Sequence, residues 1–112
     1  MHTRAKVPVD IAFLGDSPGG YNEIFVVSAD GLEIEQITDN GFWNESPRWS
    51  PDGMRIAYNA SVGSSWERGD GSIWILDIAT RKASRIFTNL KIHGPWGSVC
   101  AWSPDGTKIA TT

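Results

Sequence analysis

Six residues carry the side chains best suited to contact a ligand, and all six fall between the predicted strands. They are Trp43, Glu45, Trp66, Arg68, His93 and Trp96. Aromatic rings beside charged groups on loops are typical of surfaces that hold a protein, a peptide or a small polar ligand. We therefore interpret these residues as a candidate loop face for binding, and not as a catalytic site.

Catalytic and metal-binding chemistry has less support in the sequence. His93 and Glu45 could form an acid–base or metal-ligating pair, although the chain has just one other histidine, His2. If three chains surrounded one axis, three copies of His93 would meet there, which keeps a channel metal site open as an alternative. Two histidines give no readable Ser-His-Asp arrangement. The sequence predicts no cofactor, no metal and no enzyme activity, unless a longer protein supplies catalytic residues.

Several of these residue types also have purely structural interpretations. Loop tryptophans can fill gaps between sheets or line a seam between chains, and the tryptophans predicted on strands are expected to pack in the core. Asp52 and Asp105 each stand between a proline and a glycine, where an aspartate caps a turn. Cys100 is the single cysteine and lies in an apolar stretch, so we expect it to be buried and unpaired.

The elements that position these residues repeat along the chain. Trp-Ser-Pro-Asp-Gly occurs at 49–53 and again at 102–106, and a basic residue followed by Ile-Ala comes after each copy. The apolar segments 23–27 and 72–76 recur in the same order. The repeat is about 50 residues long, which is the period of a supersecondary unit that stacks on its neighbours.

One complete unit is predicted to hold four short strands, at 47–50, 55–59, 72–77 and 83–88. Pro-Asp-Gly at 51–53 and Asp-Gly at 30–31 have the residues that tight turns require. Four antiparallel strands in a unit of this length are typical of a β-propeller blade. The predicted fold class is therefore all-β, with about two propeller blades in the chain.

The motifs resemble a known family of repeats. They run in the order Ala-Asp-Gly at 29–31, Gln-Ile-Thr-Asp-Asn at 36–40, Trp-Ser-Pro-Asp-Gly at 49–53 and Arg-Ile-Ala-Tyr at 55–58. This order resembles the TolB-type, WD-repeat-like β-propeller repeat, and the resemblance extends over nearly the whole chain after Asp10. It implies a propeller of six blades. Such propellers occur in periplasmic scaffolds, in peptidases and in lyases, so the resemblance implies a fold more specifically than a function.

The strand count predicts how the chain is divided. We expect an N-terminal tail at 1–9, a first blade without its inner strand at 10–45, a complete second blade at 46–90, and a segment at 91–112 that completes a neighbouring blade. Two blades do not close a ring. We therefore expect oligomerisation to complete it, with a homotrimer of six blades preferred and a tetramer of eight as the alternative.

Residues 11–14 and 108–111 occupy the same place in the repeat, and a closed ring has room for one of them in each blade. Local hairpin closure favours the C-terminal segment. Burial favours the N-terminal segment, because Ile11, Phe13 and Leu14 offer more apolar surface. We expect the N-terminal segment to take the place in the ring.

Composition excludes some partners. The net charge of −3 lacks the basic surplus of a nucleic-acid-binding face, and no apolar run is long enough to span a membrane. The chain is expected to be cytoplasmic as written, or periplasmic if a signal peptide has been removed.

The leading functional prediction is a non-catalytic module that assembles into a ring and offers its loop face to a protein, a peptide or a small ligand. Three alternatives stay open. The first is lectin-like carbohydrate binding by stacking of sugars on the loop tryptophans. The others are the propeller fragment of a larger peptidase or lyase, and an engineered propeller fragment.

Overall fold

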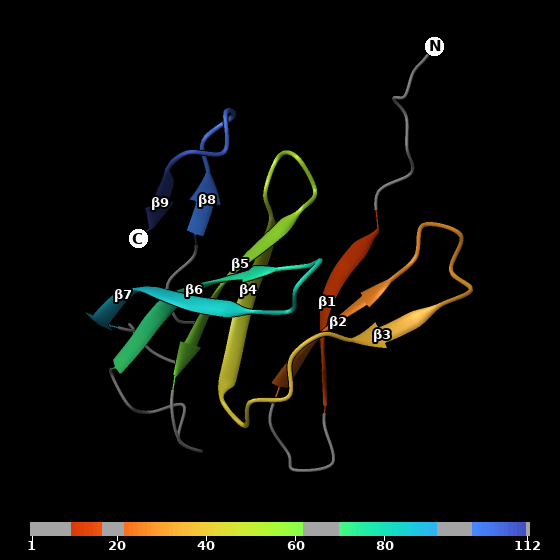
Figure 1. The fold of residues 1–112 in the computed structure, drawn as a ribbon. Helices are drawn as coiled ribbons and strands as arrows, with labels where there is room; N and C mark the ends of the chain where they lie inside the picture. The colour runs from red at the N-terminus through yellow and green to blue at the C-terminus, as the bar shows by residue number, and fades with distance from the viewer. Residues whose placement is uncertain (1–9, 17–21, 62–69, 92–99, 112) are drawn as a thin grey trace.

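A computed structural model of the chain describes residues 10–16, 22–61, 70–91 and 100–111, and the regular secondary structure in these ranges is all β-strand. The strands form three antiparallel sheets (Figure 1). The first sheet contains β1 (Ile11–Asp16), β2 (Asn22–Val27) and β3 (Ile34–Gln36). The second contains β4 (Trp43–Trp49), β5 (Arg55–Ser61), β6 (Asp70–Asp77) and β7 (Ala83–Lys91). The third is the hairpin of β8 (Cys100–Trp102) and β9 (Ile109–Thr111). The described ranges contain no helix that could cross a membrane.

The second sheet has the strand order β4-β5-β6-β7, which confirms the four antiparallel strands predicted for one repeat. Its register places Trp49 opposite Ile56, and Ile56 opposite Leu76. The bounds of the outermost strands differ from the prediction. Strand β4 begins at Trp43 instead of Pro47, and β7 continues to Lys91.

The first sheet and the β8–β9 hairpin lie on opposite sides of the second sheet (Figure 1). The first sheet has the order β1-β2-β3, and the hairpin has a single pair of strands. This side-by-side stacking of antiparallel sheets is how successive blades of a propeller pack. The fold is therefore a run of β-propeller blades.

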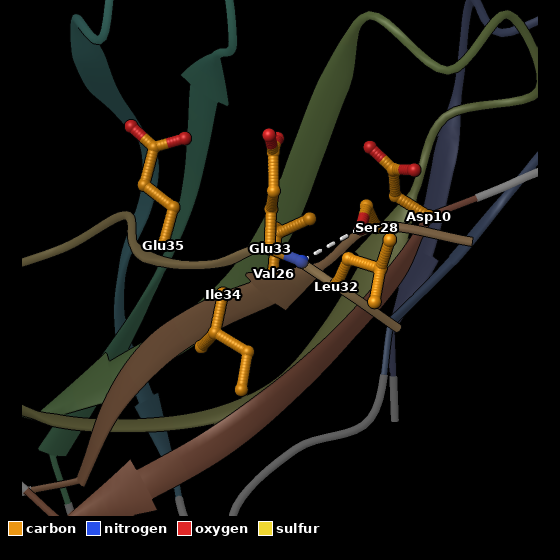
Figure 2. A pocket seen from close by; sticks show the side chains of 7 residues that line it. All are labelled: Asp10, Val26, Ser28, Leu32, Glu33, Ile34 and Glu35. Atoms are coloured by element: carbon orange, nitrogen blue, oxygen red, sulfur yellow. Dashed lines mark hydrogen bonds between the residues drawn. The ribbon is translucent and has the colours of Figure 1, made fainter. Parts of the chain in front are cut away.

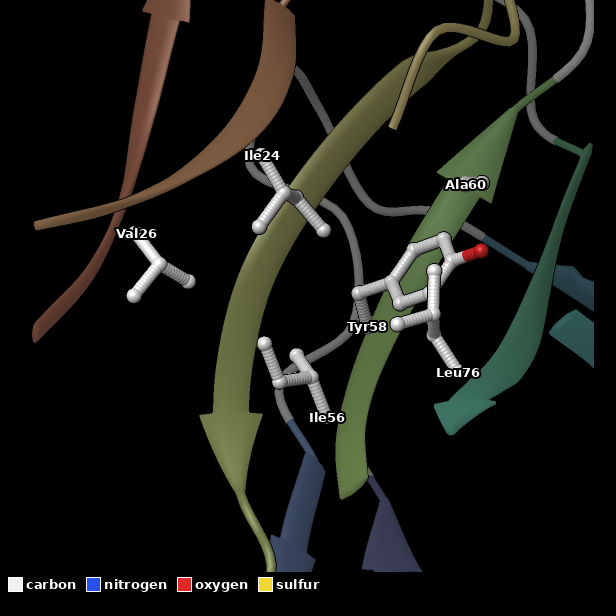
Figure 3. Packing of buried hydrophobic residues seen from close by; sticks show 6 residues of the cluster. All are labelled: Ile24, Val26, Ile56, Tyr58, Ala60 and Leu76. Atoms are coloured by element: carbon white, nitrogen blue, oxygen red, sulfur yellow. The ribbon is translucent and has the colours of Figure 1, made fainter. Parts of the chain in front are cut away.

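The packing between the first and second sheets forms the larger apolar core. Ile24 and Val26 of β2 meet Ile56, Tyr58 and Leu76 of the second sheet (Figure 3). Removing these side chains from water stabilises the contact between the two blades. The indole of Trp49 packs against the same core from the end of β4.

A smaller core forms on the other face of the second sheet. It joins Ala57 of β5 and Ile73 of β6 to Cys100 of β8. Cys100 is 1% exposed and unpaired, which confirms the sequence prediction, and burial raises the pKa of its thiol. Because successive residues of a strand point to opposite faces, Ile56 and Ala57 serve the two different cores.

Three turns at one end of the sheets share the pattern Ser-x-Asp-Gly. In the β4–β5 turn, the Ser50 hydroxyl donates to Asp52 Oδ1 at 2.6 Å, and the Met54 amide donates to the same oxygen at 2.9 Å. Gly53 follows with φ of 73°, a conformation that favours glycine. The turns with Asp30 and Asp105 have the same pair of contacts. The turn-capping interpretation of the aspartates is thus confirmed.

These contacts also predict how stability depends on acid. Hydrogen bonds from Ser103 and then Thr107 lower the pKa of Asp105 to about 2. Because the pKa in the folded protein lies below its ordinary value of 3.8, the stabilising contribution is complete above about pH 4. It is lost as the pH falls toward 2.

We therefore expect Asp105→Asn to lower the urea midpoint at pH 7 and to reduce the change of that midpoint between pH 4 and pH 2. Tryptophan fluorescence in urea at several pH values measures both effects. Asp39→Asn is the control, because Asp39 is an exposed carboxylate outside these turns. An equal loss in both variants would contradict the role of the turn.

Candidate functional site

Trp43 and Glu45 were expected on a loop, and the structure corrects this prediction. Both residues lie on β4, with Trp43 opposite Ser61 and Glu45 opposite Asn59 on β5. The predicted strand began at Pro47, which placed both residues in the loop before it. The strand instead passes through these residues as a β-bulge between Glu45 and Arg48, with Ser46 at φ of 54°. Proline has no main-chain N–H to donate, and a residue in a bulge needs no hydrogen bond to the neighbouring strand, so Pro47 is tolerated within β4.

The position of Glu45 on the strand has a chemical consequence. Its side chain is half-buried, and desolvation raises the pKa of the carboxyl. Trp43 is also half-buried, so this end of the second sheet offers an aromatic ring and a carboxyl on one strand. The other four candidates, Trp66, Arg68, His93 and Trp96, lie outside the described residues, as does the pairing of His93 with Glu45.

A buried carboxylate that the sequence analysis missed lies at the same end of the sheets. Glu23 on β2 is 1% exposed. Its Oε1 accepts hydrogen bonds from the Thr38 hydroxyl at 2.6 Å and from Asn44 Nδ2 at 3.1 Å. Its Oε2 accepts the Gly41 amide at 3.0 Å. These contacts occupy both oxygens, so Glu23 is a structural anchor and not an acid–base group.

Asn44 extends this network between the first and second sheets. The residue is fully buried, and its Nδ2 donates to the main-chain oxygen of Asn22 at 2.7 Å. The amides of Asn40 and Asn44 also exchange two hydrogen bonds, at 3.0 and 3.1 Å. The Thr38 hydroxyl accepts the Ile24 amide at 2.9 Å. The network therefore ties the connection from β3 to β4 onto β2.

The sequence contains a signal for this network. Glu23 is a charged residue at the start of an otherwise apolar strand, and Gln-Ile-Thr-Asp-Asn at 36–40 supplies Thr38 and Asn40. This motif is part of the repeat, and the polar side chains within it are the signal for the network. The second repeat has Ser72 in the place of Glu23. The acidic anchor therefore belongs to the first sheet.

A shallow depression of about 480 Å³ lies beside the β2–β3 turn (Figure 2). Its lining consists of Asp10, Val26, Ser28, Leu32, Glu33, Ile34 and Glu35. The Glu33 amide donates to the Ser28 hydroxyl at 3.1 Å, so the turn itself shapes the depression. Three carboxylates stand on its rim, but no metal-binding group of three or more acidic, histidine or cysteine side chains occurs within the described ranges. The depression is an acidic surface feature.

The outward face of the first sheet carries apolar side chains that solvent reaches. Ile11 is 59% exposed, whereas Ile56, in the same place in the second sheet, is 1% exposed. Next to it, the rings of Phe13 and Phe25 stack with centroids 5.7 Å apart. The corresponding face of the second sheet is covered by the first sheet. This face is therefore built like an interface between blades.

Comparisons with known proteins agree with the blade architecture. No protein-family model matches the chain. The Tol-Pal system protein TolB of Alcanivorax borkumensis is 34% identical over 84 residues, which is 75% of this chain and 18% of that protein. TolB of Xanthomonas oryzae pv. oryzae is 35% identical over 63% of this chain and 15% of its own length. The chain is built from TolB-type β-propeller repeats.

A solved structure gives the same fold. A protein of Agrobacterium tumefaciens assigned as TolB superposes with a TM-score of 0.68 at 21% identity, over 91% of this chain and 38% of that chain. A second kind of relative also contains the repeat, since the uncharacterized peptidase YuxL of Bacillus subtilis is 34% identical over 47% of this chain and 8% of its own length. The chain thus spans less than a fifth of the curated relatives that it matches here.

The buried network leads to a test of how the TolB-type blades are held together. Asn44→Ala removes the amide that satisfies Glu23 and the Asn22 carbonyl, and leaves both buried groups short of a donor. We expect a loss of about 2–4 kcal/mol in the free energy of unfolding, measured by urea denaturation. Asn22→Ala is the matched control, because the main-chain oxygen of Asn22 makes the contact and the substitution retains it. A loss below 1 kcal/mol in Asn44→Ala would contradict this role.

Proposed function

We propose that the chain is a non-catalytic protein-binding module of the TolB-type propeller class, and that copies of it associate to close a ring of blades. The exposed outward face of the first sheet carries the proposal. Ile11 and Phe13 have the places of the buried Ile56 and Tyr58 in the second sheet, and the ring of Phe13 stacks on Phe25. These positions are buried in the second sheet and reached by solvent in the first sheet, which supports the packing of a further blade against the outward face of the first sheet.

The number of strands supports a particular stoichiometry for this assembly. The described strands make a three-stranded sheet, a four-stranded sheet and a two-stranded hairpin. If the hairpin of one copy contributes its first strand to the three-stranded sheet of the next, each copy supplies two blades. A homotrimer then has six blades, the number that the TolB-type resemblance implies, and a tetramer of eight blades is the competitor. The resemblance also favours a periplasmic location.

The protein-binding role is proposed for the end of the sheets that carries Trp43 and Glu45. The half-buried Trp43 and the carboxyl of Glu45 combine an apolar surface with a group whose pKa burial has raised. In a ring, each copy would contribute the same pair, so the end of the propeller would present a repeated aromatic and acidic rim. Such a rim suits a protein or peptide segment with basic and apolar side chains.

A second candidate function is the propeller part of a larger peptidase. The match to YuxL over 47% of this chain favours it. In that case a longer chain would supply the neighbouring blades, and this segment would be monomeric when prepared alone.

Solution mass separates these proposals. We expect light scattering of the 112-residue chain to give a mass near three times 12.3 kDa, because association covers the exposed apolar face. A mass near four times 12.3 kDa would indicate the eight-bladed ring. A monomer with a single sharp unfolding transition would contradict self-assembly and favour a blade segment of a longer propeller.

The binding proposal has its own test. A phage-displayed peptide library panned on the assembled protein should select basic peptides with aromatic or aliphatic residues. We expect Glu45→Gln to weaken these peptides by about 10-fold with unchanged oligomer mass, since it removes a charge at the rim. Met54→Ala, on an exposed turn at the opposite end of the sheet, is the control. Equal peptide binding by the wild-type chain, Glu45→Gln and Met54→Ala would show that the peptides bind a different surface.

A further inference from the structure

The indole N–H of Trp49 is buried, and within the described part of the chain it has no hydrogen-bond partner. Its counterpart in the repeat, Trp102, does have one. Trp102 Nε1 donates to the main-chain oxygen of Arg48 at 3.0 Å. Because a buried donor without an acceptor is costly, the difference between two equivalent tryptophans points to an acceptor that belongs beside Trp49.

The position of that acceptor follows from the geometry of the satisfied pair. Trp102 stands opposite Ile109 in its hairpin, as Trp49 stands opposite Ile56 in the second sheet. Each indole packs toward the preceding sheet. Trp102 finds its acceptor on β4, which is the first strand of that preceding sheet. The equivalent strand of the first sheet would pair with the free edge of β1, and no described strand lies there.

We propose that β8 of a second copy pairs with β1 at this edge, and that the main-chain oxygen of its Ala101 accepts the Trp49 N–H. Ala101 has the place in its strand that Arg48 has in β4, so the contact would repeat the one made by Trp102. The proposal rests on the ring assembly proposed above, and it adds the strand, the register and the acceptor atom. In the assembled ring, β1 of one copy takes the place that β9 has in the structure.

The register of the exchange follows from the repeat. In the hairpin, Trp102, Ala101 and Cys100 stand opposite Ile109, Ala110 and Thr111. If β1 of a second copy replaces β9, Ile11, Ala12 and Phe13 stand opposite Trp102, Ala101 and Cys100 of β8. Ile109 packs against the smaller core, and Ile11 would enter it in the same orientation. The large ring of Phe13 would replace the smaller Thr111, which increases the apolar area removed from water.

The hairpin is suited to this exchange. Strand β8 is held on its own second sheet by the side chains of Cys100 and Trp102, by the contact of Trp102 with Arg48, and by the guanidinium of Arg55, which lies 4.7 Å from the Trp102 ring. Strand β9 pairs with β8 over three residues, whereas β1 pairs with β2 over six. Replacing β9 therefore breaks a short ladder and leaves β8 in place.

The native cysteine tests this register. In Phe13→Cys, the new thiol would stand opposite Cys100 of a second copy, at the 4.5–5.5 Å separation of Cα atoms in paired strands, a distance that a disulfide spans. Within one chain β1 and β8 lie on opposite sides of the second sheet, so such a disulfide joins two chains (Figure 1). We expect mild oxidation at alkaline pH to give covalent oligomers on a non-reducing gel, with peptides containing residues 13 and 100 linked.

Leu14→Cys is the matched control, because it shifts the thiol by one residue to the opposite face of β1. It should give no link to Cys100. If both variants retain the mass of the assembly and Phe13→Cys does not form the 13–100 link, or Leu14→Cys forms a 14–100 link equally well, the register is wrong while the ring proposal stands. If the wild-type chain is a monomer at all concentrations, both proposals are wrong.

A second variant tests the acceptor without altering β1. Trp49→Phe keeps an aromatic ring and removes the N–H. We expect it to raise the dissociation constant of the assembly by roughly 2- to 10-fold per contact, the value of one hydrogen bond, as measured by sedimentation at several concentrations. Without an acceptor from a second copy, the substitution removes an unsatisfied donor and leaves the dissociation constant unchanged or lower. That result would overturn the proposed contact even if the ring assembles.

Discussion

Both faces of the four-stranded sheet are apolar, and the rest of the structure depends on this constraint. On β5, Ile56 and Tyr58 face the first sheet, while Ala57 between them faces the hairpin. A sheet with two apolar faces is stable only with a neighbour on each side. The first sheet and the β8–β9 hairpin are those neighbours.

The repeat made much of the fold predictable. Trp-Ser-Pro-Asp-Gly fixed the places of the turns, because serine, aspartate and glycine each have a defined part in the same local geometry. The start of β4 was predicted wrongly, since the bulge at Ser46 depends on pairing with β5 rather than on local preference. The Glu23 network escaped prediction for a similar reason: its partners, Thr38 and Asn44, lie 15 and 21 residues away in the sequence. Of the six candidate site residues, the structure describes Trp43 and Glu45. Both lie on β4, so their positions depend on the pairing of β4 with β5, which was not predicted for these residues.

The two junctions between sheets are held by different chemistry. Between the first and second sheets, a buried carboxylate and two side-chain amides bind main-chain groups. Between the second sheet and the hairpin, the polar contacts include an indole N–H on a carbonyl, and the guanidinium of Arg55, which lies over the indole ring and donates to the main-chain oxygen of Gly106 at 3.1 Å. The first junction depends on a buried polar network, and the second depends on the repeated tryptophan together with Arg55. The tryptophan contact at the second junction uses a main-chain acceptor, so it does not depend on the side chain at position 48.

The outer edge of the first sheet has a consequence for behaviour at high protein concentration. Strand β3 is exposed along its whole length, and Glu33 places negative charge beside this edge, whereas Glu35 forms a salt bridge with Arg81 at 2.9 Å. Two such edges repel each other, and charged side chains on an edge strand are a common protection against sheet-to-sheet aggregation. The edge at β1 has Ile11 and Phe13 instead. The two edges of the first sheet therefore differ, and β1, rather than β3, is the edge at which another strand can add with little electrostatic cost.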